Sequence, residues 1–237
     1  MNAARNAFRP LTLALVAALG VAIGGTAQAA PAAAASAAAP NSAPAVAMNP
    51  QQIVQQIASE MSAALKGHRA EYQKDKPKLV ALINRILLPH FDSTYAALLV
   101  LGRYARSATP QQINAFRQAF YDALIDRYAS GLVNYREGRV TILPSRGASD
   151  DGRRQIVRSE VTLDNGSKVS VDYVFRHASD GQWKAFDVVI EGISYIAAYR
   201  SQVGEEIRHS SLDALTKRLQ SEGGKAIDAM KKQDAQG

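Results

Sequence analysis

Two carboxylates, Asp187 and Glu191, flank the apolar run Val188–Ile190 near the end of a predicted strand. A carboxyl group in apolar surroundings has a raised pKa, because burial disfavours its charged form, and such a group can transfer protons in catalysis. If the strand continued through Glu191, the two side chains would share one face. The alternative is a strand-end acid that pairs with a basic side chain or caps a turn. We identify no second catalytic group and therefore assign no catalytic residue.

The other residue types that could do chemistry lack the spacing that catalysis or metal binding requires. Residues 192–196 resemble a nucleophile elbow, Gly-x-Ser-x-Gly, but they lack its last glycine. The four histidines, His68, His90, His177 and His209, do not have metal-ligand spacing. The chain has no cysteine, which excludes disulfides, thiolate metal sites and a cysteine nucleophile. Glycine-rich phosphate-binding motifs are also missing from the sequence, and we expect no metal and no cofactor.

The first half of the folded chain has the periodicity of helices. Asn49-Pro50 is typical of an N-cap followed by proline at the first helical position, and apolar residues then recur at helical spacing as far as Leu65. Further helices are predicted from Leu79 to Leu87, from Ser93 to about Tyr104, and from the capping box at Thr109–Gln112 to Gly138.

The second half contains four β-rich runs, at Val140–Leu143, Gln155–Leu163, Lys168–Arg176 and Trp183–Ile190. Turn signals at 164–166 and 180–181 predict hairpins between successive strands. Helical spacing returns after Gly192, and a last helix ends before Gly223-Gly224. The sequence therefore predicts a single-domain α+β fold with an antiparallel or mixed sheet of four or more strands and about six or seven helices.

The faces of the strands indicate where apolar surface is buried. Val169, Val171, Tyr173 and Phe175 alternate with polar residues, which is typical of a strand with one buried face. The run Trp183–Ile190 is apolar on both faces, so it should be central or covered on both sides. Such surface can fill an ordinary core or line a cavity, and periodicity alone does not separate the two.

Residues 1–29 have the features of a secretory signal peptide. Arg5 and Arg9 precede an apolar run from Leu11 to Gly24, which is shorter than the roughly 20 residues of a bilayer span, and Ala27–Ala29 offers a cleavage site. We expect export to the periplasm. Residues 30–48, rich in Ala, Pro and Ser, are predicted to be a disordered tether and residues 49–223 a folded domain. Residues 224–237 are predicted to be a polar tail that frays or forms a short terminal helix.

The charge of the chain argues against nucleic-acid binding. The formal net charge of +7 falls to +5 once Arg5 and Arg9 are removed with the signal peptide. Lysines and arginines are scattered, without a basic stripe interleaved with aromatic residues. A mild positive charge suits contact with anionic lipid surfaces or acidic partners.

Two segments resemble the MlaC family, which is also described as a family of toluene-tolerance proteins. The first is Leu98-Leu99-Val100-Leu101-Gly102-Arg103-Tyr104-Ala105-Arg106-Ser107-Ala108-Thr109-Pro110 with the helix after it. The second runs from Trp183 through Glu191-Gly192-Ile193-Ser194 and Tyr199-Arg200 to Leu215. The resemblance covers residues 49 to 219.

This resemblance implies a sheet wrapped by helices around a deep apolar cavity that holds the acyl chains of a phospholipid as cargo. It further implies a periplasmic shuttle between an outer-membrane lipoprotein–porin complex and an inner-membrane ABC transporter with a periplasmic MCE-domain ring, which maintains outer-membrane lipid asymmetry. The alternatives are an enzyme on a similar cone-shaped scaffold with Asp187 or Glu191 as base, an envelope adaptor whose pocket is filled by its own side chains, and a carrier of hopanoids.

The carrier hypothesis selects apolar residues of the long helices and of the strands as the cavity wall. They are Leu98, Leu99, Leu101, Phe116, Phe120, Leu124, Tyr128, Val171, Tyr173, Phe175, Phe186, Val188, Ile190, Ile193 and Ile196. Three basic residues, Arg103, Arg106 and Arg200, are predicted to lie at the cavity mouth, where they would meet partner surfaces or the lipid phosphate.

Overall fold

A capped helix opens the folded part of the chain in the computed structural model, which describes residues 48–133, 140–144, 152–162 and 166–234. Helix α1 (Pro50–Leu65) begins after Asn49, whose side chain accepts a hydrogen bond from the Gln52 amide while the Gln52 side chain accepts one from the Asn49 amide. This reciprocal cap pairs backbone donors that the first turn leaves free. The predicted signal peptide and nearly all of the predicted tether lie outside the described residues.

Four more helices precede the sheet. They are α2 (Arg69–Lys74), α3 (Lys76–Leu87), α4 (Ser93–Leu101) and α5 (Pro110–Val133), with the 3-10 turns η2 (Leu88–His90) and η3 (Gly102–Arg106) on either side of α4. The cap expected at the start of α5 is present, because Thr109 Oγ1 accepts a hydrogen bond from the Gln112 amide at 3.2 Å. The end predicted for this helix, Gly138, lies outside the described residues.

The sheet is antiparallel throughout, with strand order β1-β2-β3-β4-β5. Its strands are β1 (Val140–Ile142), β2 (Arg154–Thr162), β3 (Lys168–His177), β4 (Trp183–Ile190) and β5 (Ile193–Ser194). The predicted buried face of β3 is confirmed, since Val169, Val171, Tyr173 and Phe175 are all buried. On the opposite face Ile156 of β2 is 45% exposed.

A β-bulge in β4 changes which residues face the buried side of the sheet. Val174 pairs with Asp187 and Phe175 pairs with Ala185, so Phe186 is an extra residue opposite the partner strand. A bulge of this kind breaks the two-residue alternation. Strict alternation along β4 would place Phe186 on the same face of the sheet as Val188 and would place Ala185 on the opposite face. Because of the bulge, Ala185 instead occupies a register position on the face of Val188.

The chain turns sharply after β4, and this turn separates the side chains of Asp187 and Glu191. Glu191 has φ of 50° and Gly192 has φ of 78°, which are the left-handed conformations of a two-residue hairpin between β4 and β5. The strand therefore does not continue through Glu191, and the shared face considered for Asp187 and Glu191 does not form.

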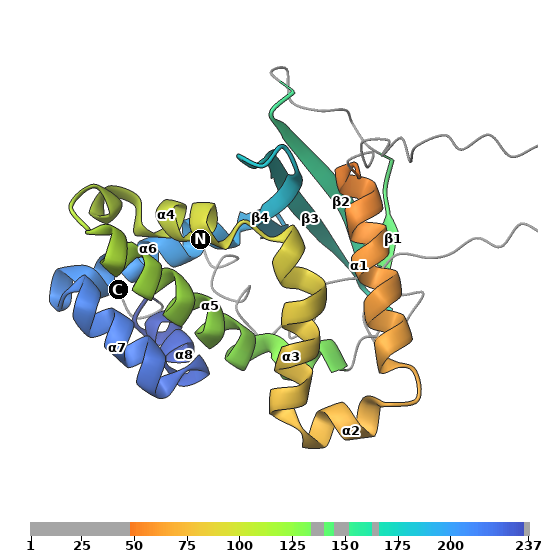
Figure 1. The fold of residues 1–237 in the computed structure, drawn as a ribbon, viewed down its shortest axis with the longest axis horizontal. Coiled ribbons are helices and arrows are strands. Elements are labelled where there is room, and N and C mark those ends of the chain that lie inside the picture. The colour runs from red at the N-terminus through yellow and green to blue at the C-terminus, as the bar shows by residue number, and fades with distance from the viewer. Residues whose placement is uncertain (1–47, 134–139, 145–151, 163–165, 235–237) are drawn as a thin grey trace, which may run out of the picture.

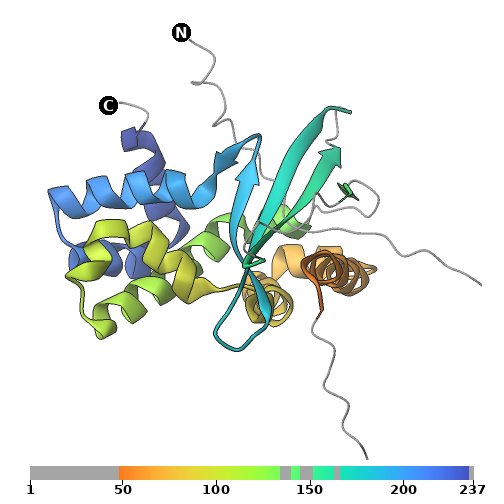
Figure 2. The same ribbon diagram turned by 90° about the horizontal axis from the view of Figure 1, so that it is seen from above.

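Three helices follow the sheet, α6 (Tyr195–His209), α7 (Leu212–Glu222) and α8 (Gly224–Asp234). The α+β fold class and the single domain predicted from the sequence are confirmed, with eight α-helices and five strands within the described residues. Figure 1 shows α4 to α8 gathered at one end of the molecule and α1 to α3 at the other, with α5 extending between the groups. In Figure 2 the sheet stands next to α6, and α1 is seen nearly end-on.

Two hydrophobic cores correspond to these two groups of helices. One lies between α1, α3, the end of α5 and the buried face of the sheet, and includes Met61, Ile83 and Val171. The other lies among α4 to α8 and includes Phe116 and Leu219. No helix among the described residues combines the length and the apolar character that a membrane span requires.

Helix α8 belongs to the second core, in contrast to the polar tail that we expected for residues 224–237. Ala226, Ile227 and Met230 are at most 1% exposed. Their spacing of one and four residues places them on one helical face, and the lysines that suggested a tail occupy the remaining positions. Gly223 and Gly224 allow α8 to fold back, because a Cβ at Gly224 would lie 2.9 Å from the Arg127 Cα.

Candidate functional site

An apolar cavity of about 280 Å³ lies where the two hydrophobic cores meet. Its wall includes members of both, such as Val54 and Phe175 from one and Ala97 and Phe120 from the other. This volume is close to the lower end of typical small-molecule sites, and the lining is almost entirely apolar, as in such sites.

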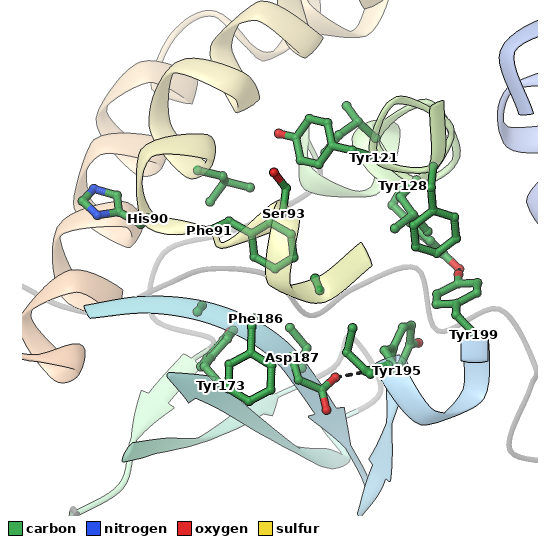
Figure 3. A pocket seen from close by; sticks show the side chains of 18 of the residues that line it. His90, Phe91, Ser93, Tyr121, Tyr128, Tyr173, Phe186, Asp187, Tyr195 and Tyr199 are labelled. Atoms are coloured by element: carbon green, nitrogen blue, oxygen red, sulfur yellow. Dashed lines mark hydrogen bonds between the residues drawn. The ribbon is translucent and has the colours of Figure 1, made fainter. Parts of the chain in front are cut away.

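Helices form most of the wall, and the sheet closes one side. α5 contributes residues along about four turns, α1 and α4 contribute small or aliphatic side chains, and β3 and β4 contribute Tyr173, Phe175 and Val188. Figure 3 shows Tyr173 and Phe186 rising from the strands towards Phe91 and Ser93, with Tyr128 and Tyr199 at one end.

Nine of the fifteen side chains that the sequence selected for the wall line this cavity. They are Phe120, Leu124, Tyr128, Tyr173, Phe175, Phe186, Val188, Ile190 and Ile196. The helical spacing of α5 and the strand alternation of β3 and β4 orient most of them. The bulge at Phe186 brings that residue, Asp187 and Val188 to the cavity together.

The other six lie outside the cavity lining: Leu98, Leu99, Leu101, Phe116, Val171 and Ile193. Leu101 and Phe116 are buried in the core of α4 to α8, and Val171 is buried in the other core. Leu98 is 36% exposed and Ile193, next to the hairpin turn, is 39% exposed. α4 is apolar all round, so its sequence carried no signal of orientation, and its cavity face is formed by Ser93, Ala96 and Ala97.

The three arginines predicted for the mouth do not line the cavity either. Arg103 and Arg106 are exposed on η3, and Arg200 is exposed on α6, where its guanidinium packs over Gly102. A Cβ at Gly102 would lie 2.6 Å from Arg200 Nε, and the φ of 54° at this position favours glycine. Arg200 therefore lies beside η3, the turn that carries Arg103 and Arg106.

A different arginine, Arg117 of α5, lines the cavity. Its Nη1 donates to Ser93 Oγ at 3.3 Å, and its Nη2 donates to Asn114 Oδ1 at 2.8 Å. Arg117 is not among the residues predicted for the cavity, although its spacing on α5 indicates that position. Arg117 precedes Leu124 by seven residues and Tyr128 by eleven, which places it on their helical face.

Both carboxylate oxygens of Asp187 accept hydrogen bonds from residues at the start of α6. Its Oδ2 accepts a hydrogen bond from Ser194 Oγ at 2.6 Å and its Oδ1 accepts one from the Ile196 amide at 3.0 Å. Ser194 Oγ in turn accepts from the Ala197 amide, so the pair caps the start of α6. Glu191, in the turn between β4 and β5, accepts a hydrogen bond from the Ser170 amide of β3. This geometry corresponds to the turn-capping alternative.

Three tyrosines at the cavity wall, Tyr121, Tyr128 and Tyr199, pair their hydroxyl groups with polar partners. Tyr128 Oη and Tyr199 Oη lie 2.9 Å apart, and Lys231 Nζ of α8 donates to Tyr128 Oη. Burial raises the pKa of Tyr199 well above its ordinary value, with a further contribution from Tyr128. Burial also raises the pKa of Tyr121 to about 12, and its hydroxyl donates to Asn84 Oδ1 at 2.8 Å. The phenols of Tyr121 and Tyr199 are therefore neutral at pH 7.

His90 completes the polar groups at this wall. Burial lowers its pKa from the ordinary value of 6.5, which Glu60 partly offsets and Lys184 reinforces. Among the described residues, no cluster of three or more His, Asp or Glu side chains has the geometry of a metal site. The cavity thus offers an apolar volume with a few polar groups in its wall.

The model of the family described as MlaC protein matches residues 55–221 of the chain. Toluene tolerance protein ttg2D of Pseudomonas putida is 28% identical over 183 residues, which are 77% of this chain and 83% of that protein. The intermembrane phospholipid transport system binding protein MlaC of Haemophilus influenzae is 23% identical over 172 residues, covering 72% of this chain and 80% of that protein.

A solved structure has the same fold. It is the phospholipid-binding protein from Ralstonia solanacearum in complex with a phospholipid, with a TM-score of 0.67 and 27% identity. The match covers 76% of this chain and 99% of that chain.

Proposed function

Because the chain belongs to the MlaC family, we propose that it is a periplasmic phospholipid carrier that encloses acyl chains in the cavity between its two cores. The apolar cavity at the seam of the two cores carries this proposal. The Ralstonia relative, whose structure contains a phospholipid, supports the choice of cargo.

The apolar wall suits the energetics of carrying lipid through water. Two acyl chains contain on the order of 30 methylene groups, and exposing each costs about 0.8 kcal/mol. The full exposure would cost more than about 20 kcal/mol, so transfer requires that the tails stay enclosed. The nine predicted wall residues that line the cavity, with Val54 and Ile57 of α1, are the contacts we assign to the tails.

The carrier moves lipid between an outer-membrane lipoprotein–porin complex and an inner-membrane ABC transporter with a periplasmic MCE-domain ring, and so maintains outer-membrane lipid asymmetry. The sequence has no nucleotide-binding motif, so the free energy for release comes from a partner whose docking favours an open state. Arg103, Arg106 and Arg200 form part of the docking surface, where exposed cations would meet acidic partner surfaces and speed encounter.

Cleavage of the signal peptide after residue 29 releases the mature chain into the periplasm. Residues 30–48 then form a tether ahead of the folded domain. The mature protein is accordingly the form to test.

The test is native mass spectrometry of the purified mature chain and of two variants. Val188→Asp places a charge in the cavity wall, and Ile156→Asp places the same charge on the opposite, exposed face of the same sheet. The wild type and Ile156→Asp should carry phospholipid, whereas Val188→Asp should lose it, because the tails would have to desolvate the new carboxylate. Circular dichroism checks that Val188→Asp is folded.

Three results would contradict the proposal. A wild type without lipid would indicate an adaptor with a filled pocket. Copurified hopanoid would show that the cargo is a hopanoid and not a phospholipid. A small substrate turned over by the wild type and lost in Asp187→Asn would favour the enzyme over the carrier.

A further inference from the structure

Three side chains at the cavity wall can carry a charge, and two of them are accounted for. Both oxygens of Asp187 accept hydrogen bonds from the start of α6. Burial lowers the pKa of His90, so it is neutral at pH 7. Arg117 is the third, and within the described residues no carboxylate lies at ion-pair distance from it. A guanidinium beside an apolar cavity and without a counter-ion is an unusual arrangement, because half-buried charges are generally paired.

The partners of Arg117 leave donors available. A guanidinium has five N–H groups in a fixed plane. Nε and Nη2 each donate one to Asn114 Oδ1, and Nη1 donates one to Ser93 Oγ. One N–H therefore remains on each terminal nitrogen. Two such charged donors can bind oxygens of a phosphate or carboxylate.

Ser93 can add a third donor. Its Oγ accepts the hydrogen bond from Arg117, and within the described part of the chain no acceptor is assigned to its own hydroxyl hydrogen. Ser93 is also the first residue of α4, where the helix dipole favours a negative charge. Figure 3 shows its hydroxyl on the side of the cavity opposite the strands, near Tyr121.

The neighbouring carboxylate of Asp92 does not neutralise the charge of Arg117. Asp92 adjoins Ser93 in sequence, but its Oδ2 accepts from Arg176 Nη1 at 2.8 Å and its Oδ1 caps the Tyr95 amide at 2.9 Å. Both oxygens are thus committed to other groups, and Arg176 balances the charge of Asp92.

We propose that Arg117, with Ser93, binds the phosphodiester of a lipid whose tails fill the adjoining cavity. This inference rests on the proposed carrier function and extends it to the anionic group of the cargo. A phosphodiester has two non-bridging oxygens that share one negative charge, which fits the two remaining guanidinium donors. The apolar cavity beside Arg117 commits the phosphate to a lipid, because a free phosphate would leave that volume without an occupant.

The experiment uses competition between two lipids with identical tails. The delipidated mature chain is incubated in detergent with equal amounts of dioleoylphosphatidylglycerol and dioleoylglycerol, and native mass spectrometry gives the ratio of the two bound lipids. The variants are Arg117→Gln, Arg117→Lys and, as a matched control, Arg85→Gln on the exposed side of α3, away from the cavity lining. A partly unfolded sample lowers both bound forms equally, so the ratio isolates recognition of the phosphate.

The wild type and Arg85→Gln should prefer the phospholipid. Arg117→Gln should reduce that preference by about tenfold to a hundredfold, the range for hydrogen bonds to a charged group. Arg117→Lys should retain part of it, because an ammonium keeps the charge but loses the planar pair of donors. Addition of 10 mM inorganic phosphate should leave the bound phospholipid in place.

The outcomes separate this inference from the proposed function. A wild type that binds neither lipid would overturn the carrier itself. A wild type that binds both lipids equally, or an Arg117→Gln variant that keeps the wild-type preference, would overturn the phosphate site and leave the carrier standing. Displacement of phospholipid by inorganic phosphate would overturn the assignment to a lipid phosphodiester.

Discussion

Replacing Ile227 by alanine should destabilise the whole domain, although the residue lies beyond the segment that the family model matches. Its side chain is fully buried among α5, α6 and α7, next to Ala226 and Met230. The change removes three carbon atoms, worth about 0.8 kcal/mol each, and leaves a cavity, so we expect a loss of about 2–5 kcal/mol. For a domain of this size each kcal/mol lowers Tm by about 2–4 °C, and a loss of 3 kcal/mol corresponds to about 6–12 °C.

The measurement is thermal unfolding of the delipidated mature chain, followed by circular dichroism at 222 nm. Lys225→Ala, on the exposed side of the same helix, is the control and should leave Tm within about 1 °C, as surface substitutions generally do. If Ile227→Ala also shifted Tm by less than about 1 °C, α8 would not be part of the core, and residues 224–237 would behave as the polar tail that their composition suggests.

Three further predictions concern polar groups at the cavity. Because the folded chain protonates His90 at a lower pH than the unfolded chain does, the contribution of this residue is fully present above pH 6.5 and is lost as the pH falls towards the lowered pKa. His90→Gln should therefore flatten the dependence of the urea midpoint on pH between about 7 and 5; an unchanged dependence would contradict the burial of this ring. Tyr199→Phe removes the 2.9 Å hydrogen bond to Tyr128 and should lower the free energy of unfolding by about 1 kcal/mol in urea titrations, whereas no change would mean that the pair is not formed in solution. Asp187→Asn keeps one acceptor where two are used, so it should cost about 1–3 kcal/mol while bound phospholipid persists; loss of lipid in a folded variant would show that Asp187 acts in binding.

Regular periodicity made much of the fold and part of the site predictable from the sequence. The alternation of Val169 to Phe175 gave the buried face of β3, and the helical spacing of Phe120, Leu124 and Tyr128 gave the cavity face of α5. Both patterns reflect backbone geometry alone, which tertiary contacts do not alter.

The predictions assigned residues to the wrong surface where the periodicity is interrupted or does not indicate which face of an element is directed at the cavity. The bulge at Phe186 changes the face on which the preceding residues of β4 lie, and no local sequence pattern predicts this bulge. The uniformly apolar α4 could not be oriented, so Leu98 and Leu101 were assigned to a wall that Ala96 and Ala97 form. Arg117 was missed for a different reason: a charged residue within an apolar stripe is ordinarily taken for the edge of the stripe.

The position of the cavity at the seam of two separate cores has a consequence for the lifetime of the empty chain. Each core is closed by its own side chains, but the surfaces that meet at the seam are completed only by an occupant. A bound lipid therefore acts as a replaceable piece of the protein interior. At a ligand concentration a thousand times Kd, such an occupant adds about 4 kcal/mol to the free energy of unfolding. Empty molecules would open more often and be cleaved first by proteases, so proteolysis itself would enrich the population in loaded chains.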